Sequence, residues 1–254
     1  MRSYRWWSVF SKACVGLAFS IATASAAVNI DRTRLIFTSA DQVQSLNLSN
    51  DSATPMLIQA WTDNGDPNAS PDTSHTPLVV MPPVFRMLPG ELRSLRLMLS
   101  SRQKLAADRE SQFWLNIYQI PPNTRPADNG TRKVILPLRL RLKVFIRPAG
   151  LAAPQERDEQ QLRFILNGST LRIENPTPWF MSLNVQPGRQ KAISGLMVAP
   201  KAMLEVPLNA ALNAGEKVSY EVITDSGNTR SYRVSPQIGK QGKQGKQGKQ
   251  GKQE

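Results

Sequence analysis

The sequence predicts an all-β protein built from two β-sandwiches of unequal size. Its apolar and polar residues alternate in many short runs, which is the period of a β-strand. Turn-forming segments separate these runs, among them residues 63–67 (Asp-Asn-Gly-Asp-Pro) and Pro89-Gly90. No long stretch combines helical spacing of apolar residues with helix caps. Short strands at this spacing are typical of sandwiches.

Residues 1–26 have the three parts of a secretory signal peptide. Two arginines and a lysine form a positive start, residues 13–22 form a short apolar run, and Ala24-Ser25-Ala26 supplies the cleavage pattern. The apolar run is shorter than the roughly 20 residues that a membrane span requires, and no later stretch qualifies. We therefore expect an exported mature chain that begins at Ala27 and has no integral membrane segment.

The only cysteine, Cys14, lies inside this signal segment. The expected mature chain therefore has no disulfide, although exported proteins often use them. Stability must come from the burial of apolar side chains. Residues 27–238 are long enough for two domains of about 100 residues each.

We expect the first domain to span residues 27–148. Its predicted strands before the last one lie at residues 45–48, 56–61, 94–99 and 113–118.

The last strand of this domain, residues 135–144, has the most regular pattern in the chain. Its even-numbered residues are all apolar, and its odd-numbered residues include Arg139, Arg141 and Lys143. Such a strand has one apolar and one cationic face. Pro137 lacks a backbone N–H, which favours the edge of a sheet. Proteins normally protect a long apolar edge, so this one indicates pairing with another chain.

A linker is predicted at residues 147–154. We place the boundary between the two domains inside this linker, between residues 148 and 149. The second domain is expected to span residues 149–238. Its predicted strands lie at residues 162–166, 171–174, 180–185, 203–206, 218–223 and 231–234.

The tail, residues 239–254, repeats Gly-Lys-Gln five times before Glu254. These residues cannot bury a core, and the repeat lacks the proline of collagen, so we expect a disordered cationic segment. It either remains solvated or binds weakly to acidic lipid or glycan.

Charge and residue types exclude several functions. The formal charge of +13 falls to about +6 on the folded part once the signal and the tail are set aside, and no basic-aromatic platform suggests nucleic acid. His75 is the only histidine, which excludes a multi-histidine metal site and, with no mature cysteine, a Cys–His pair. No segment resembles a nucleophile turn. We expect no catalysis, no metal and no cofactor.

Six motifs in order resemble the periplasmic pilus-assembly chaperones, the PapD-like family. The resemblance covers residues 28–236, and together the motifs are specific although each alone is weak. They are VNIDRTR (residues 28–34), PPVFRMLPG (82–90), DRES (108–111), IYQIPP (117–122), KVFIRP (143–148) and IENPTP (173–178).

This resemblance implies two immunoglobulin-like domains in a boomerang arrangement with a cleft between them. It implies a periplasmic chaperone that caps pilin (fimbrial) subunits lacking their last strand and delivers them to an outer-membrane usher. Chaperone–pilin complexes are themselves a standard example of such β-strand addition. The short segment between residues 122 and 134 and the missing disulfides favour the short-loop branch.

The resemblance also assigns roles to individual residues. Arg34 and Lys143 match the cleft residues that hold the C-terminal carboxylate of the subunit, a task suited to charge-assisted donors. Glu110, Arg147 and Asp225 match an ionic cluster between the domains.

The alternation of the basic strand adds a role for its apolar face. Leu140, Leu142 and Val144 should face the core of their own domain. Val134, Leu136 and Leu138 should continue that face beyond the domain and fill the groove of a subunit.

The alternative is an exported immunoglobulin-like structural subunit or adhesin. Such a subunit would lack its own final strand and carry a donor segment at its start. A complete strand followed by a second sandwich favours the chaperone.

Overall fold

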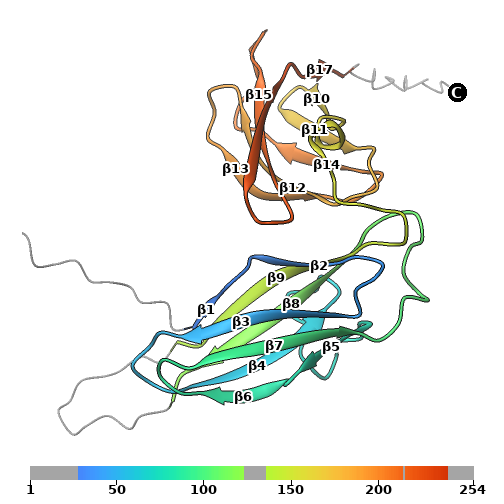
Figure 1. The fold of residues 1–254 in the computed structure, drawn as a ribbon. Coiled ribbons are helices and arrows are strands. Elements are labelled where there is room, and N and C mark those ends of the chain that lie inside the picture. Colours follow the sequence, from blue (N-terminus) through green and yellow to red (C-terminus); the bar gives the residue numbers. More distant parts are fainter. Residues whose placement is uncertain (1–27, 123–135, 214, 240–254) are drawn as a thin grey trace, which may run out of the picture.

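The computed structural model describes residues 28–122, 136–213 and 215–239, and these are almost entirely β (Figure 1). Strands β1 to β9 form one sandwich and strands β10 to β17 form a second. The predicted all-β fold of two sandwiches is confirmed.

The first sandwich consists of a four-stranded and a five-stranded sheet. The four-stranded sheet has the order β1-β3-β7-β5, with β1 at Val28–Ile30, β3 at Val43–Asn50, β5 at Leu78–Met81 and β7 at Leu92–Leu99. The five-stranded sheet has the order β2-β9-β8-β4-β6, with β2 at Arg34–Phe37, β4 at Met56–Asp63, β6 at Val84–Met87, β8 at Ser111–Ile120 and β9 at Leu138–Ile146.

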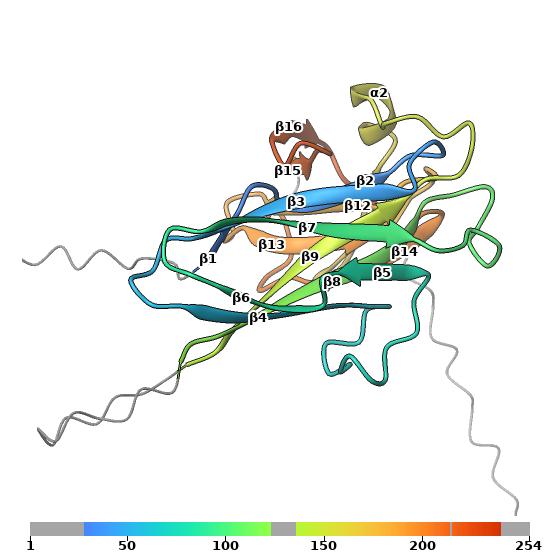
Figure 2. The same cartoon turned by 60° about the horizontal axis from the view of Figure 1, so that its bottom comes forward.

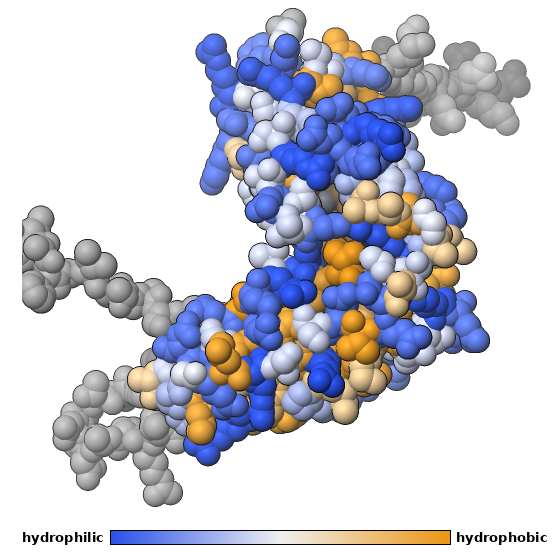
Figure 3. Space-filling view, in the orientation of Figure 1, coloured by the Kyte–Doolittle hydropathy of each residue, from blue (hydrophilic) through white to orange (hydrophobic). Residues whose placement is uncertain are grey.

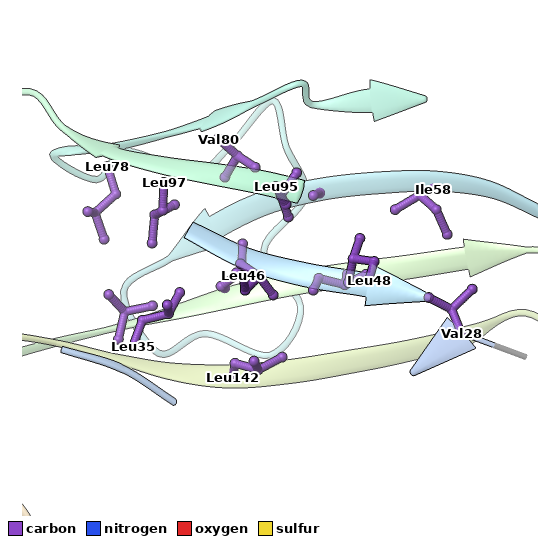
Figure 4. Packing of buried hydrophobic residues seen from close by; sticks show 14 of the residues in the cluster. Val28, Leu35, Leu46, Leu48, Ile58, Leu78, Val80, Leu95, Leu97 and Leu142 are labelled. Carbon is purple, nitrogen blue, oxygen red and sulfur yellow. The ribbon is translucent and has the colours of Figure 1, made fainter. Parts of the chain in front are cut away.

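Alternate side chains of the two sheets meet in a common core. Figure 4 shows Leu46 and Leu48 of β3 packed between Leu95 of β7 and Leu142 of β9. All four are buried, and burying a leucine side chain stabilises the fold by about 1.5–3 kcal/mol. The core thus fixes which face of β9 points inward.

The second sandwich has two four-stranded sheets and one short helix, α2 (Glu156–Glu159). One sheet has the order β14-β11-β10-β17, with β10 at Arg163–Asn167, β11 at Thr170–Asn175, β14 at Ala202–Pro207 and β17 at Gln237–Ile238. The other has the order β13-β12-β15-β16, with β12 at Met181–Pro187, β13 at Ile193–Val198, β15 at Val218–Ile223 and β16 at Thr229–Val234.

The two sandwiches meet at an angle. In Figures 1 and 2 the sheet that contains β12 and β13 lies next to β2 and β9 of the first domain. The space-filling view shows a hollow between the two domains on the left of the molecule (Figure 3). Residues on β9 and β2 therefore lie where side chains of both domains can reach one ligand.

Every predicted strand overlaps an observed strand, but six observed strands were not predicted. They are β1, β2, β5, β6, β13 and β17. All but β13 have two to four residues, too few for a clear alternation, and β13 is interrupted by Gly195.

The prediction for the basic strand requires a correction. The strand begins at Leu138 rather than at residue 135, and Pro137 precedes it. The predicted edge position holds only for Leu138–Leu142, because β2 pairs with Lys143–Ile146 on that side. The core-facing prediction is confirmed for Leu142 and Val144, which are buried, while Leu140 is partly buried against the same core.

Some expectations concern residues outside the described part. These are the signal segment, the loop from residue 123 to residue 135 with Val134, and the tail from Lys240 onward. Within the described ranges, no helix has the length and apolar character needed to cross a membrane.

Candidate functional site

Two cations lie side by side at the boundary between the domains. Strand β2 runs parallel to β9, and this pairing places Arg34 directly opposite Lys143. Lys143 Nζ donates to Ser182 Oγ on β12, at 3.0 Å. Arg34 Nη1 donates to the carbonyl oxygen of Ile223 on β15, also at 3.0 Å. Both side chains thus reach from the first domain to the wall of the second.

The surroundings of this pair disfavour positive charge. Burial, with a further contribution from Arg34, lowers the pKa of Lys143 to about 8. Burial also lowers the pKa of Arg34, although Asp225 and Glu110 act in the opposite direction. Among the residues that the structure describes, Arg34 Nε is buried and has no hydrogen-bond partner. Within the described ranges, no carboxylate lies within salt-bridge distance of either residue. The pair is therefore suited to an anion from outside the chain.

The three residues predicted to form an interdomain ionic cluster lie in contact. Arg147 Nε donates to Glu110 Oε1 at 2.8 Å, and its two terminal nitrogens donate to the Asp225 carboxylate, each at 2.7 Å. Glu110 and Arg147 are buried. Burial raises the pKa of Glu110, and the positive charge of Arg147 opposes this rise. A buried network of this kind specifies a geometry more than it adds stability.

Further contacts hold the domains next to this cluster. Glu110 Oε2 accepts the backbone N–H of Phe180 at 2.9 Å, and Phe180 packs against Phe145 with ring centroids 5.8 Å apart. At the surface, Lys201 Nζ lies 2.6 Å from Asp108 Oδ2. The described residues thus join the domains through ionic, backbone and aromatic contacts.

The other two cations of β9 are engaged within their own domain. Arg141 donates to both carboxylate oxygens of Asp63, at 2.7 and 2.9 Å, and lies over the ring of Trp114. Arg139 donates to Asn116 Oδ1 and lies over the ring of Trp61. The cationic face predicted from sequence therefore leaves only Lys143 for the cleft.

Strand β9 has a free backbone edge just before the cationic pair. Residues Leu138–Leu142 pair with β8 on one side and with no described strand on the other. Leu136 and Leu138 are 77% and 46% exposed. Both therefore have the exposure that filling a partner's groove requires, and that role stays a prediction.

Sequence reasoning missed several groups that shape this site. The carbonyl of Ile223 has no signature, because every residue carries one. Ser182 lies within a predicted strand, but only the fold brings it to Lys143. Trp114 and Asn116 were detectable in principle, since their spacing of two puts both on the outer face of β8.

The arrangement of these groups is suited to recognition of an extended chain. No group of three or more His, Cys, Asp or Glu side chains in the described residues has the arrangement of a metal site. A free strand edge can add an extended chain, and two desolvated cations can hold a carboxylate.

Sequence comparison identifies both halves of the chain. Residues 27–152 match "Pili and flagellar-assembly chaperone, PapD N-terminal domain", and residues 158–234 match "Pili assembly chaperone PapD, C-terminal domain".

Individual proteins with these features are similar over most of their length. The chaperone protein MrkB of Klebsiella pneumoniae is 32% identical over 85% of this chain and 94% of its own. The chaperone protein FimB/FhaD of Bordetella pertussis is 31% identical over 91% of this chain and 98% of its own.

A solved structure is similar in fold as well. The Salmonella enterica SafB chaperone, in complex with the SafA pilin, has a TM-score of 0.72 and 28% identity over 84% of this chain and 98% of its own.

Proposed function

Because the chain belongs to the PapD-like family of pilus-assembly chaperones, we propose that its cleft holds the C-terminal carboxylate of a pilin subunit while β9 completes the subunit's fold. The chain is a chaperone that binds and folds pilus subunits. We propose the roles of its individual residues from their geometry.

One observation carries the proposal: the free edge of β9 ends where the cation pair begins. Strand β2 occupies the edge from Lys143 onward, so an added strand has room only along Leu138–Leu142. If it runs parallel to β9, as β2 does, its last residue lies beside Arg34 and Lys143. The terminal carboxylate of the subunit then meets both cations.

Apolar residues before and at the start of β9 complete the proposed capture. We propose that Val134, Leu136 and Leu138 fill the groove that the missing strand leaves in the subunit. Burying three such side chains contributes about 1.5–3 kcal/mol each before the cost of ordering the partner. The carboxylate then fixes the register, because apolar contacts alone would allow a shift by two residues.

The ionic cluster is proposed to set the angle of the cleft. Arg147 connects Glu110 on the first domain to Asp225 on the second, so it constrains both walls. We place the two working domains at residues 27–148 and 149–238, and we propose that residues 1–26 direct the chain to the periplasm. There it would deliver its subunits to an outer-membrane usher.

Coexpression with a pilin subunit encoded beside this chaperone tests the proposal. The intact subunit should copurify with the chaperone from the periplasm. A subunit without its last three residues should be lost, because its carboxylate no longer reaches Arg34 and Lys143. Equal recovery of both subunits would contradict carboxylate anchoring.

A further inference from the structure

Strand β2 is the shorter of the two strands that carry the proposed carboxylate site. It has only four residues, and its side chains alternate between the outer face and the core, with Leu35 and Phe37 buried. A slip of one residue along β9 would turn Arg34 toward the core and remove it from Lys143. The site therefore requires something that fixes the register of β2.

The side chain of Arg102 is placed to do this. Arg102 lies in the connection between β7 and β8, and its guanidinium donates to three backbone carbonyls. Nη2 donates to Thr38 O at 2.6 Å and to Asp41 O at 2.8 Å. Nη1 donates to Arg147 O at 3.1 Å. Thr38 and Arg147 are the first residues after β2 and β9, so one side chain joins the ends of both strands.

Other hydrogen bonds next to Arg102 also connect the ends of β2 and β9. The backbone N–H of Arg147 donates to Phe37 O at 2.8 Å, so hydrogen bonding between β2 and β9 continues to the ends of both strands. The Asp41 carboxylate accepts hydrogen bonds from the backbone N–H and the hydroxyl of Thr38, each at 2.7 Å. The turn after β2 is thus fixed on one side by Asp41 and on the other by Arg102. Lysine could not replace Arg102, because a single ammonium lacks the planar fork that reaches separate carbonyls.

We propose that Arg102 is a positioning residue that holds β2 in register with β9 and thereby keeps Arg34 beside Lys143. This inference rests on the proposed function for what the site binds. The hydrogen bonds that Arg102 makes, and the experiment that tests them, do not involve a subunit.

The test compares Arg102→Ala with wild type in the full mature chain by two NMR measurements. Hydrogen exchange of the Arg147 amide reports the closure of β2 on β9. It should become about tenfold faster or more, the effect of losing hydrogen bonds from a charged group, while core amides of the second domain keep their protection. Titration of Lys143 Nζ reports the position of Arg34. The pKa of Lys143 should rise from about 8, because Arg34 no longer opposes its charge.

Two control variants calibrate these measurements. Arg34→Ala should raise the pKa of Lys143 in the same direction without changing exchange at Arg147. Arg93→Ala should change neither, since Arg93 is also an arginine that donates to a backbone carbonyl, Arg86 O, but at the far side of the domain.

Three results would overturn the inference. The first is an unchanged exchange rate at Arg147, and the second is an unchanged pKa of Lys143. The third is equal acceleration at all amides of the first domain, which would indicate general destabilisation. Failure of the wild-type protein to bind subunits would instead contradict the proposed function and leave these measurements valid.

Discussion

Arg34 and Lys143 lie opposite each other on β2 and β9, and no described carboxylate forms a salt bridge with either. Two neighbouring, partly buried cations destabilise a fold unless an anion compensates them. The two carboxylates whose charges act on Arg34, Glu110 and Asp225, are bound to Arg147 instead. The arrangement keeps the cationic pair available for the carboxylate of a partner.

Replacing Lys143 with methionine should abolish subunit capture without unfolding the protein. Methionine keeps most of the side-chain volume but cannot hold a carboxylate, and removing one partner of a desolvated ion pair costs about 2–5 kcal/mol of binding free energy. Copurification of the subunit and the melting temperature of the free chaperone measure the two effects. The exposed Lys191→Met variant is the matched control and should behave as wild type. Normal capture by Lys143→Met would refute the anchor.

Subunit binding should weaken as the pH rises above about 8. The pKa of Lys143 in the free protein is about 8, and a bound carboxylate raises it, so binding takes up a proton. The dissociation constant should increase by up to roughly tenfold per pH unit until the pKa of the complex is reached. Arg34 contributes no such slope, because a guanidinium keeps its charge. Titrations from pH 7 to pH 10 measure the effect, and Lys143→Met should show no comparable slope.

Leu136→Asp should abolish subunit binding but leave the melting temperature of the free protein nearly unchanged. Leu136 is 77% exposed, so its own domain loses no core contact, whereas the groove of the subunit would have to bury an unpaired carboxylate. Leu142→Asp, on the strand β9 that follows Leu136, is the matched control. Leu142 is buried, so this change should strongly destabilise the free chaperone. Equal destabilisation by both changes would show that Leu136 belongs to the core.

Asp63→Ala should destabilise the first domain by about 3–5 kcal/mol, the usual cost of removing one partner of a buried ion pair. Asp63 is fully buried, and it accepts hydrogen bonds from Arg141 and from Asn116. Urea denaturation measures the loss. Replacing Arg141 with methionine in the same protein should recover part of it, because the guanidinium that donates directly to Asp63 is then no longer left without its carboxylate. Asp108→Ala, at an exposed ion pair, should lower the free energy of unfolding far less than Asp63→Ala does.

The sequence alone determined the strands with clear alternation and the orientation of their side chains. The parity of β9 separates Leu142 and Val144, which face the core, from Lys143, which faces the cleft. This follows from local geometry, because successive side chains on a strand point to opposite faces. The motif resemblance added Arg34 and the ionic cluster, which alternation does not reveal.

Only the tertiary structure decided which strands are neighbours and which charges are free. The sequence shows three similar cations on β9, yet Arg139 and Arg141 lie within salt-bridge distance of Asp63 on β4, and Lys143 forms no salt bridge with a described carboxylate. The edge of β9 is open only at Leu138–Leu142, because β2 pairs with the rest of the strand, Lys143–Ile146. These contacts join residues that are tens of residues apart, and the fold of the whole chain, rather than any local pattern, determines them.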